Sequence, residues 1–493
     1  MCVAVRPISL LPLLLALPLW LSAGCYGCRQ RAPAPAERPA APAKPDKPAG
    51  PPANLVLISV DTLRRDHLRV YGYQRDTAPI VDELARDSVI FDGAIASNTN
   101  TAPSHATMFT GLYPTTHGIT RNGMRLRREI QTLAAILKQK GYRTAAGISG
   151  WSLHRSTGLD RGFELYEDRF AGSRRPGQTT WSRLKGWLQQ NAGKRAPFFL
   201  FLHLFDPHAP YDPPHELVLP FVPDLTRLVT MSERRGLPGL LKKIQPRLSK
   251  REIREYEARY DAEIVYSGLV IRRMFSELRR LKAFDNSLIV FLSDHGETLF
   301  ERGWVTDHGG RAYDEQIRVP LIIRFPDKRQ ARRRIAEQVE MVDLLPTVLE
   351  TLGIAVPAGL AGRSLLPLIE AGDATPSGPP RVAFSSARPE PKRVPEIRGA
   401  ALIRKGLIST VRVPPFKLIE YPIRGGGWYR QLFNLKSDPL EKHNLAGEQP
   451  ALAEKLHRQL ERWRKQTGGG HRAPPPELSP EVERALRALG YVE

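Results

Sequence analysis

The fold is decided by Leu55-Val56-Leu57-Ile58-Ser59-Val60-Asp61, an apolar run that ends in an acidic residue. The arrangement recurs in Ser287-Leu288-Ile289-Val290-Phe291-Leu292-Ser293, which is followed by Asp294 and His295. Short runs of Val, Ile and Leu are typical of strands buried on both faces of a parallel sheet. Such sheets bind ligands beyond the carboxyl ends of their strands. Two acidic strand tips, one followed by a histidine, therefore predict a divalent metal held by carboxylate and imidazole.

A hydroxyl-rich segment, Thr101-Ala102-Pro103-Ser104-His105-Ala106-Thr107, lies between these two runs. It leads into a helix that we expect over 104–109. A metal ion together with an activated hydroxyl is the equipment for cleaving an ester of a charged oxyacid.

The chain around these motifs alternates strand and helix patterns, which predicts an α/β fold with a mostly parallel central sheet and helices on both faces. The expected helices are 77–86, 130–140 and 252–281, and the expected strands are 143–148, 198–204 and 319–325. After about residue 395 the pattern changes to short strands at 400–403, 407–411 and 416–421, then a helix over 450–463. This predicts a small C-terminal α+β subdomain with an antiparallel sheet.

Five segments together resemble the sulfatases of the alkaline-phosphatase superfamily. They read NLVLISVDTLRRDHL, TNTAPSHATMFTGLYPTTHG, FFLFLHLFDPHAPY, LSDHGETLFERGWVTDHGG and LFNLKSDPLEKHNLA. They follow the family's order and cover roughly residues 54 to 465. The resemblance implies an alkaline-phosphatase-like fold and hydrolysis of sulfuric esters.

The sequence departs from the family at the nucleophile. Typical sulfatases carry C/S-x-P-x-R, whose first residue becomes formylglycine, whereas this chain has Thr101 there and His105 at the arginine position. Threonine cannot yield that aldehyde, because its carbinol carbon carries a methyl group. The family's second aspartate is Thr62, and the stretch 147–151 lacks the family's lysine.

The resemblance implies that Asp61, Thr101, Asp294 and His295 hold one divalent metal ion. Manganese, zinc and calcium suit such a set, and the histidine favours manganese over calcium. Thr101 would be the metal-activated nucleophile. Its alternative role is to cap a helix, and the alternative role of Asp61 is the same. The set also resembles that of phosphonate monoester hydrolases and that of the phosphoglycerol or phosphoethanolamine transferases. In the transferases, an unmodified threonine takes this position.

Three histidines at family positions are candidates for the remaining catalytic work. His208 and His308 would hold a non-bridging oxygen or protonate the leaving oxygen. His105 would support the nucleophile, or would be a structural histidine on the helix face. We expect His203 and His117 to be structural.

Three functions remain open on the sequence alone. The first is a hydrolase of sulfate, phosphate or phosphonate esters. The second is an envelope phosphoryl-group transferase. The third is an inactive lipoprotein that binds anionic glycans, which the lost cysteine, arginine and lysine favour and the retained metal donors oppose. The oxyacid, the leaving group and the oligomeric state stay open.

The charge of the chain favours anionic partners. Its 73 Lys and Arg residues against 51 Asp and Glu give a net charge of +22, and such an excess attracts anions over long range. The basic residues are dispersed and no nucleic-acid motif accompanies them, so we expect an anionic ester substrate and no nucleic acid.

The N-terminus predicts export. Arg6 precedes an apolar core over 8–23 that is too short to span a bilayer comfortably. Ser22-Ala23-Gly24-Cys25 resembles a bacterial lipobox, so we expect a membrane anchor through lipidated Cys25 in the cell envelope; the alternative is an ordinary secretory signal. The predicted organisation is a signal peptide (1–24), a Pro/Ala-rich tether (25–53), a catalytic domain (54–394) and a C-terminal subdomain with its tail (395–493).

Overall fold

The computed structural model describes residues 53–170, 172–222, 249–303, 306–371, 380–388 and 406–468, together with residues 480 and 484. The expected signal peptide, Cys25 and nearly all of the expected tether lie outside the described residues. Within the described ranges, no helix has the length and apolar character needed to cross a bilayer.

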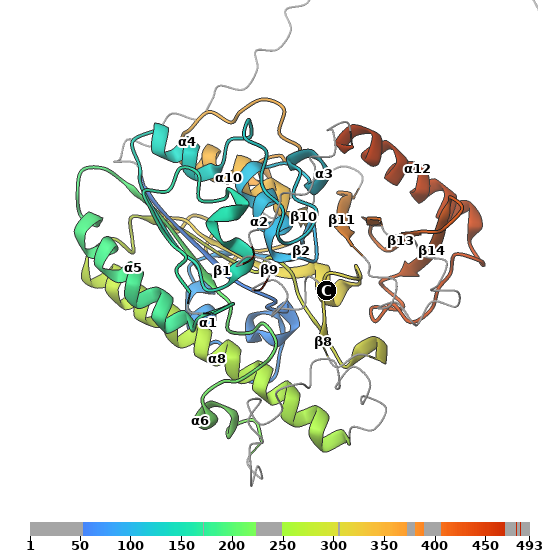
Figure 1. The fold of residues 1–493 in the computed structure, drawn as a ribbon, viewed down its shortest axis with the longest axis horizontal. Helices are drawn as coiled ribbons and strands as arrows, with labels where there is room; N and C mark the ends of the chain where they lie inside the picture. The colour runs from blue at the N-terminus through green and yellow to red at the C-terminus, as the bar shows by residue number, and fades with distance from the viewer. Residues whose placement is uncertain are drawn as a thin grey trace, which may run out of the picture. The chain divides into compact units, whose positions relative to one another are not determined.

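A central sheet of eight strands organises the larger part of the structure (Figure 1). Its strand order is β10-β2-β9-β6-β1-β5-β3-β4. The strands are β1 Asn54–Val60, β2 Val89–Ile95, β3 Arg143–Gly147, β4 Leu165–Glu167, β5 Phe198–Leu204, β6 Ser287–Leu292, β9 Arg318–Arg324 and β10 Arg334–Glu340. β9 is antiparallel to both of its neighbours, whereas the other pairs are parallel. The prediction of a mostly parallel sheet is confirmed.

Helices cover both faces of this sheet, as predicted (Figure 1). Leu55 and Leu57 of β1 join a core with α2 (Thr101–Thr110), α4 (Leu133–Gln139) and α10 (Leu344–Thr351). Val56 and Ile58 face a second core with α1 (Pro79–Ala85), α5 (Gly177–Asn191) and α8 (Lys250–Arg280). The apolar run of β1 is continuous because both faces of the strand are buried. The shorter helices are α3 Pro114–His117, α6 His215–Val218, α9 Asp314–Ile317 and α11 Leu366–Glu370.

Capping residues set the helix boundaries that differ from the expected ones. α2 begins at Thr101, three residues before the expected start, because Pro103 falls in its first turn, where the missing N–H costs little. α4 begins at Leu133, after Thr132 accepts a hydrogen bond from the Ala135 amide. α8 begins at Lys250, behind a capping box formed by Ser249 and Glu252.

Three strands of the central sheet, β2, β4 and β10, were not expected from the sequence, and β4 has only three residues. β2 contains Asp92-Gly93 in the middle of an apolar run, and β10 reads Arg-Ile-Ala-Glu-Gln-Val-Glu. β10 lies at the edge of the sheet, where part of each strand face meets solvent. Its charged residues therefore mask the apolar signal that identifies buried strands.

A second sheet of four antiparallel strands follows, in the order β11-β12-β13-β14. Its strands are β11 Ala383–Ala387, β12 Ile408–Val413, β13 Phe416–Pro422 and β14 Trp428–Asn434, and α12 (Pro450–Thr467) packs on it. β14 was not expected, the strand expected over 400–403 lies outside the described residues, and β11 precedes the expected boundary at 395. The predicted antiparallel C-terminal sheet is confirmed.

Candidate active site

The carboxyl ends of β1 and β6 bring three of the predicted metal ligands together. The two strands are parallel neighbours, with Ser59 opposite Leu292, so the residues that follow them share one edge of the sheet. Asp61, Asp294 and His295 are fully buried, and their ligand atoms all lie within 4.8 Å of one another. The structure therefore places these three donors as the apolar runs predicted.

Thr101 joins this cluster from the first position of α2. The Ser104 hydroxyl anchors the helix by donating to the Asp294 carbonyl at 2.6 Å. The Thr101 side chain lies close enough to Asp61 to lower the pKa of that carboxyl, but outside hydrogen-bonding geometry. The positive end of the helix dipole also favours negative charge at this position.

Four buried atoms of this cluster make no hydrogen bond to any other described residue. They are Asp61 Oδ1, Thr101 Oγ1, Asp294 Oδ2 and His295 Nε2. Buried polar atoms are normally paired, so four unpaired ones in one place require an explanation. One from each predicted ligand is the donor set that a cation would take.

The titration of the cluster supports the same conclusion. Burial raises the pKa of Asp61 to about 7, although the charge of His295 opposes the shift. Burial and the charge of Asp61 also raise the pKa of Asp294. His295 responds the other way: burial disfavours its charged form, but Asp294 and Asp61 outweigh burial and raise its pKa. Two carboxylates that repel each other in a buried site fit a bound cation.

His105 supports the nucleophile through the backbone. Its Nδ1 donates to the Thr101 carbonyl at 2.8 Å, and its Nε2 accepts from the Ser59 hydroxyl at 2.9 Å. Burial lowers the pKa of His105 to about 4, so the ring is neutral. Both nitrogens are engaged, so His105 orients the first turn of α2 and is not a base for Thr101 Oγ1.

His203 lies closer to the site than the sequence indicated. Its Nε2 donates to Asp61 Oδ2 at 3.1 Å and thereby leaves Oδ1 for a ligand. A histidine in the otherwise apolar strand β5, opposite Ser59 of β1, was the available signal. His117 is structural as expected: it contacts the Thr107 hydroxyl and accepts from the Ile119 amide.

His208 and His308, the two predicted proton-transfer residues, lie beside the cluster. Their ring centroids are 4.8 Å apart, and the His308 ring stacks on His295 at the same centroid distance. The sequence did not point to their partners: His308 Nδ1 lies 2.9 Å from Glu297 Oε1, and Tyr211 donates to the other Glu297 oxygen at 2.5 Å. Glu297 follows Asp294-His295-Gly296 directly, so its position in the motif was the missed signal.

Thr62, at the position of the family's second aspartate, faces away from the cluster. Its hydroxyl donates to the Pro207 carbonyl at 2.9 Å, while its amide points to Asp294 Oδ1 at 3.3 Å. Its backbone is left-handed, with a φ of 56°. The turn after β1 thus lies against Asp294 through the Thr62 amide, but Thr62 supplies no second carboxylate to the cluster.

Comparison with known proteins is consistent with this arrangement. Residues 53–354 match the family model described as Sulfatase. The chain is 26% identical over 348 residues to an ulvan-active sulfatase of Formosa agariphila, a match that covers 65% of this chain and 65% of that relative's length.

Solved structures share the fold. The phosphonate monoester hydrolase of Agrobacterium radiobacter aligns with a TM-score of 0.67 and 22% identity, over 84% of this chain and 96% of that one. A protein in complex with its substrate D-glucosamine-2-N,6-O-disulfate aligns with a TM-score of 0.70 and 21% identity, over 86% of this chain and 100% of that one.

The family model and the sulfatase relative identify the chain as a sulfuric ester hydrolase. The chain belongs to the sulfatase family, whose model matches more than half of its length. The resemblance predicted from the five segments is confirmed.

Proposed function

We propose that this protein is a metal-dependent sulfuric ester hydrolase that uses the unmodified hydroxyl of Thr101 as its nucleophile. Family membership supports the sulfate ester. The observation that carries the proposal is the set of four buried, unpaired donor atoms on Asp61, Thr101, Asp294 and His295. The ulvan and glucosamine-disulfate substrates of the similar proteins favour a sulfated glycan.

A divalent cation held by these four residues would neutralise the two carboxylates and lower the pKa of the Thr101 hydroxyl. His203 and His105 position the metal ligands and the nucleophile. His203 holds one oxygen of Asp61, while His105 and Ser104 hold the first turn of α2 against Asp294. The nucleophile is thus positioned by contacts that exist before substrate binds.

Attack forms a bond between Thr101 Oγ1 and the sulfur of the ester, the Thr101 hydroxyl gives up its proton to water, and the bond to the leaving oxygen breaks. Burial and then the charge of His308 lower the pKa of His208 well below its usual value, so His308 is the residue that would give a proton to the leaving oxygen. Formylglycine enzymes release sulfate by collapse of a hemiacetal, but a threonyl ester has no such route. Water must therefore attack the sulfur of the threonyl intermediate.

The same chemistry suits phosphorus, which makes phosphate and phosphonate esters the alternative substrates. The fold shared with a phosphonate monoester hydrolase and the unmodified threonine favour this alternative. If an acceptor other than water resolves the threonyl ester, the protein is a phosphoryl-group transferase. An inactive glycan-binding protein would have no need to keep four unpaired donors buried together.

The test is turnover of matched sulfate, phosphate monoester, phosphate diester and phosphonate substrates by Thr101→Ala and Thr101→Ser. Thr101→Ala should lose about a thousandfold or more, as dissected hydrolases do when the nucleophile is removed, and Thr101→Ser should keep part of the activity. The control is Thr110→Ala on the same helix, whose hydroxyl donates to the Ala106 carbonyl and accepts from the Leu112 amide, away from the donor cluster. Near wild-type turnover by Thr101→Ala would remove the nucleophile assignment.

A further inference from the structure

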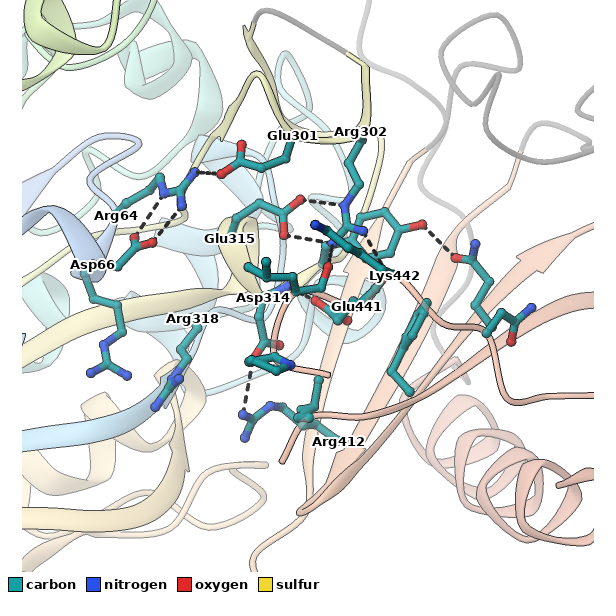
Figure 2. A pocket seen from close by; sticks show the side chains of 18 of the residues that line it. Arg64, Asp66, Glu301, Arg302, Asp314, Glu315, Arg318, Arg412, Glu441 and Lys442 are labelled. Carbon is teal, nitrogen blue, oxygen red and sulfur yellow. Dashed lines mark hydrogen bonds and ion pairs between the residues drawn. The ribbon is translucent and has the colours of Figure 1, made fainter. Parts of the chain in front are cut away.

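A second cavity, of about 950 Å³, lies where the loops of the central sheet meet the four-stranded sheet (Figure 2). Arg64 and Glu301 line it from the first part, and Arg412 and Tyr429 line it from the second. None of the four clustered donors of the candidate active site lines this cavity. It is therefore a separate site, in the size range of small-molecule pockets.

At one end of the cavity, the charged side chains are paired with one another. Arg64 pairs with Asp66 and Glu301, each at 2.7 Å. Arg302 pairs with Glu315 at 3.2 Å. Figure 2 shows these pairs facing one another around the upper part of the cavity. Because these charges neutralise each other, this end of the cavity has no net positive charge that would attract an anionic ligand.

The other end carries three arginines from three different elements: Arg65 after β1, Arg318 at the start of β9, and Arg412 on β12. Among the described residues, Arg318 donates only to the Asp92 carbonyl, at 2.9 and 3.2 Å, and no carboxylate oxygen lies within 4.0 Å of it. Arg65 shares that carbonyl at 2.7 Å. Arg412 donates to Gln338 and, at 3.2 Å, to Asp314.

The two nearby carboxylates do not neutralise this end, because other cations already hold them. Arg334 pairs with Asp92 at 2.5 Å, whereas Arg65 lies 3.9 Å from it. Lys417 pairs with Asp314 at 2.9 Å, closer than Arg412 does. The end of the cavity therefore keeps a net positive charge.

Two further observations show that this charge is costly. The Nε atoms of Arg65 and Arg412 are buried and make no hydrogen bond to any described residue, and Arg412 as a whole is 8% exposed. Burial and then the charge of Arg65 lower the pKa of Arg318 to about 10. Buried cations that repel each other and keep unused donors require an anion to offset them.

We propose that Arg65, Arg318 and Arg412 form a binding site for an oxyanion (a sulfate, phosphate or carboxylate group) that is distinct from the metal cluster. Planar guanidinium forks match these anions in pairs of hydrogen bonds. The cavity far exceeds one small ion, so the group belongs to a larger anionic molecule. Because one wall belongs to the four-stranded sheet, this ligand bridges the two parts of the fold. The site does not depend on the proposed hydrolysis.

The test is calorimetric titration of the full chain with inorganic sulfate and with a disulfated disaccharide, at constant ionic strength in chloride. Arg318→Gln should raise the Kd of both probes by about tenfold or more, the loss expected for one charge-assisted contact. Arg279→Gln is the control: it removes the same charge from an exposed pair with Glu83. It should leave both values unchanged. Asp294→Ala acts at the metal cluster, where sulfate and a sulfated glycan would also bind, so it should remove that binding and keep the binding that Arg318→Gln weakens.

The two probes distinguish the source of the anion. Tighter binding of the disaccharide than of sulfate, with both sensitive to Arg318→Gln, supports a group on a larger molecule, and equal affinities support a free anion in the same site. Wild-type affinity in Arg318→Gln would overturn the proposal, and so would loss of all binding in Asp294→Ala. If Arg318→Gln does not fold, Arg318→Lys replaces it: a clearly weaker sulfate Kd supports the site, and an unchanged Kd overturns it.

Discussion

Both the metal cluster and the junction between the two sheets bury carboxylates. The two regions differ in whether those carboxylates have cationic partners within the fold. Asp61 and Asp294 bury oxygens that no described residue hydrogen-bonds. At the junction, Lys417 lies 2.9 Å from Asp314 and 2.8 Å from Glu441, and Arg412 adds a second cation. Burial alone would raise the pKa of Asp314, but Lys417 and Arg412 hold it well below its usual range.

This difference shows how buried charge can be interpreted. A carboxylate whose partners are built into the fold stabilises that fold and has no capacity left for a ligand. A carboxylate buried without partners lowers stability until a ligand supplies the missing charge. Removing a charged residue should therefore lower activity at the metal cluster and lower stability at the junction.

The largest effect should come from Asp294→Ala. It removes one donor, so we expect metal content to fall and turnover to fall by about a thousandfold or more, as when one member of a catalytic set is removed. The metal-free protein should not lose stability, because a buried carboxylate with one oxygen that lacks a hydrogen bond has gone. Elemental analysis, turnover and denaturant unfolding check the three parts. Full metal occupancy in this variant would contradict the assignment.

Lys417→Met should show the opposite pattern. It leaves Asp314 and Glu441 buried without their main cation, which should cost about 3 kcal/mol of unfolding free energy or more. Metal content should not change. Lys442→Met is the control, because Lys442 is exposed on the same cavity and should change stability by less than about 0.5 kcal/mol. Equal stability of the two variants in urea would show that the junction pairs contribute nothing.

The effect of metal removal on stability should also distinguish the metal cluster from the junction. A chelator should lower the unfolding free energy of the wild type by about 2.7 kcal/mol, relative to protein with free metal at a hundred times its Kd. Asp294→Ala should show no such shift, whereas Lys417→Met should keep it. Thermal unfolding with and without chelator measures all three, and a wild type insensitive to both chelator and added metal would remove the metal site.

A third pair of buried carboxylates, Glu340 and Asp343, has only part of its charge neutralised and predicts a pH-dependent effect. Glu340 accepts hydrogen bonds from Tyr113 and Phe384, but the cation Arg381 pairs with Asp343. Burial, then the charge of Asp343, raises the pKa of Glu340 to about 8.

The folded state therefore keeps a proton that the unfolded state releases near pH 4.5. Stability from this group is full below that value and declines as pH rises towards 8, by at most about 1.4 kcal/mol per pH unit. Urea unfolding at several pH values should show this decline in the wild type and a flatter profile in Glu340→Gln. Identical profiles would contradict the shift.

Much of the architecture could be predicted from local patterns. The apolar runs before Asp61 and Asp294 indicated strands buried on both faces, and such strands place their carboxyl ends at one edge of a sheet. The positions of β2, β4, β10 and β14 could not be predicted in this way. β2 carries Asp92-Gly93, and β10 is a charged edge strand, so the periodicity that identifies buried strands is absent there.

The residues of the candidate site likewise fall into those that the local sequence predicted and those that it did not. Asp61, Asp294 and His295 were predictable because each belongs to the strand that places it, and the motif around Thr101 was predictable by resemblance. His203, Glu297 and Tyr211 were not, because their roles depend on contacts between distant segments, such as Tyr211 with Glu297.

The sequence alone determined the family, the alternation of strands and helices, and the presence of Thr101 where the family motif has cysteine or serine. Only the tertiary structure decided which buried charges have partners. It showed that Lys417 neutralises Asp314 while Asp61 Oδ1 stays unpaired, and that Arg65, Arg318 and Arg412 converge from three elements. The physical reason is that local periodicity reports burial, whereas the neutralisation of a buried charge depends on residues hundreds of positions away in the chain.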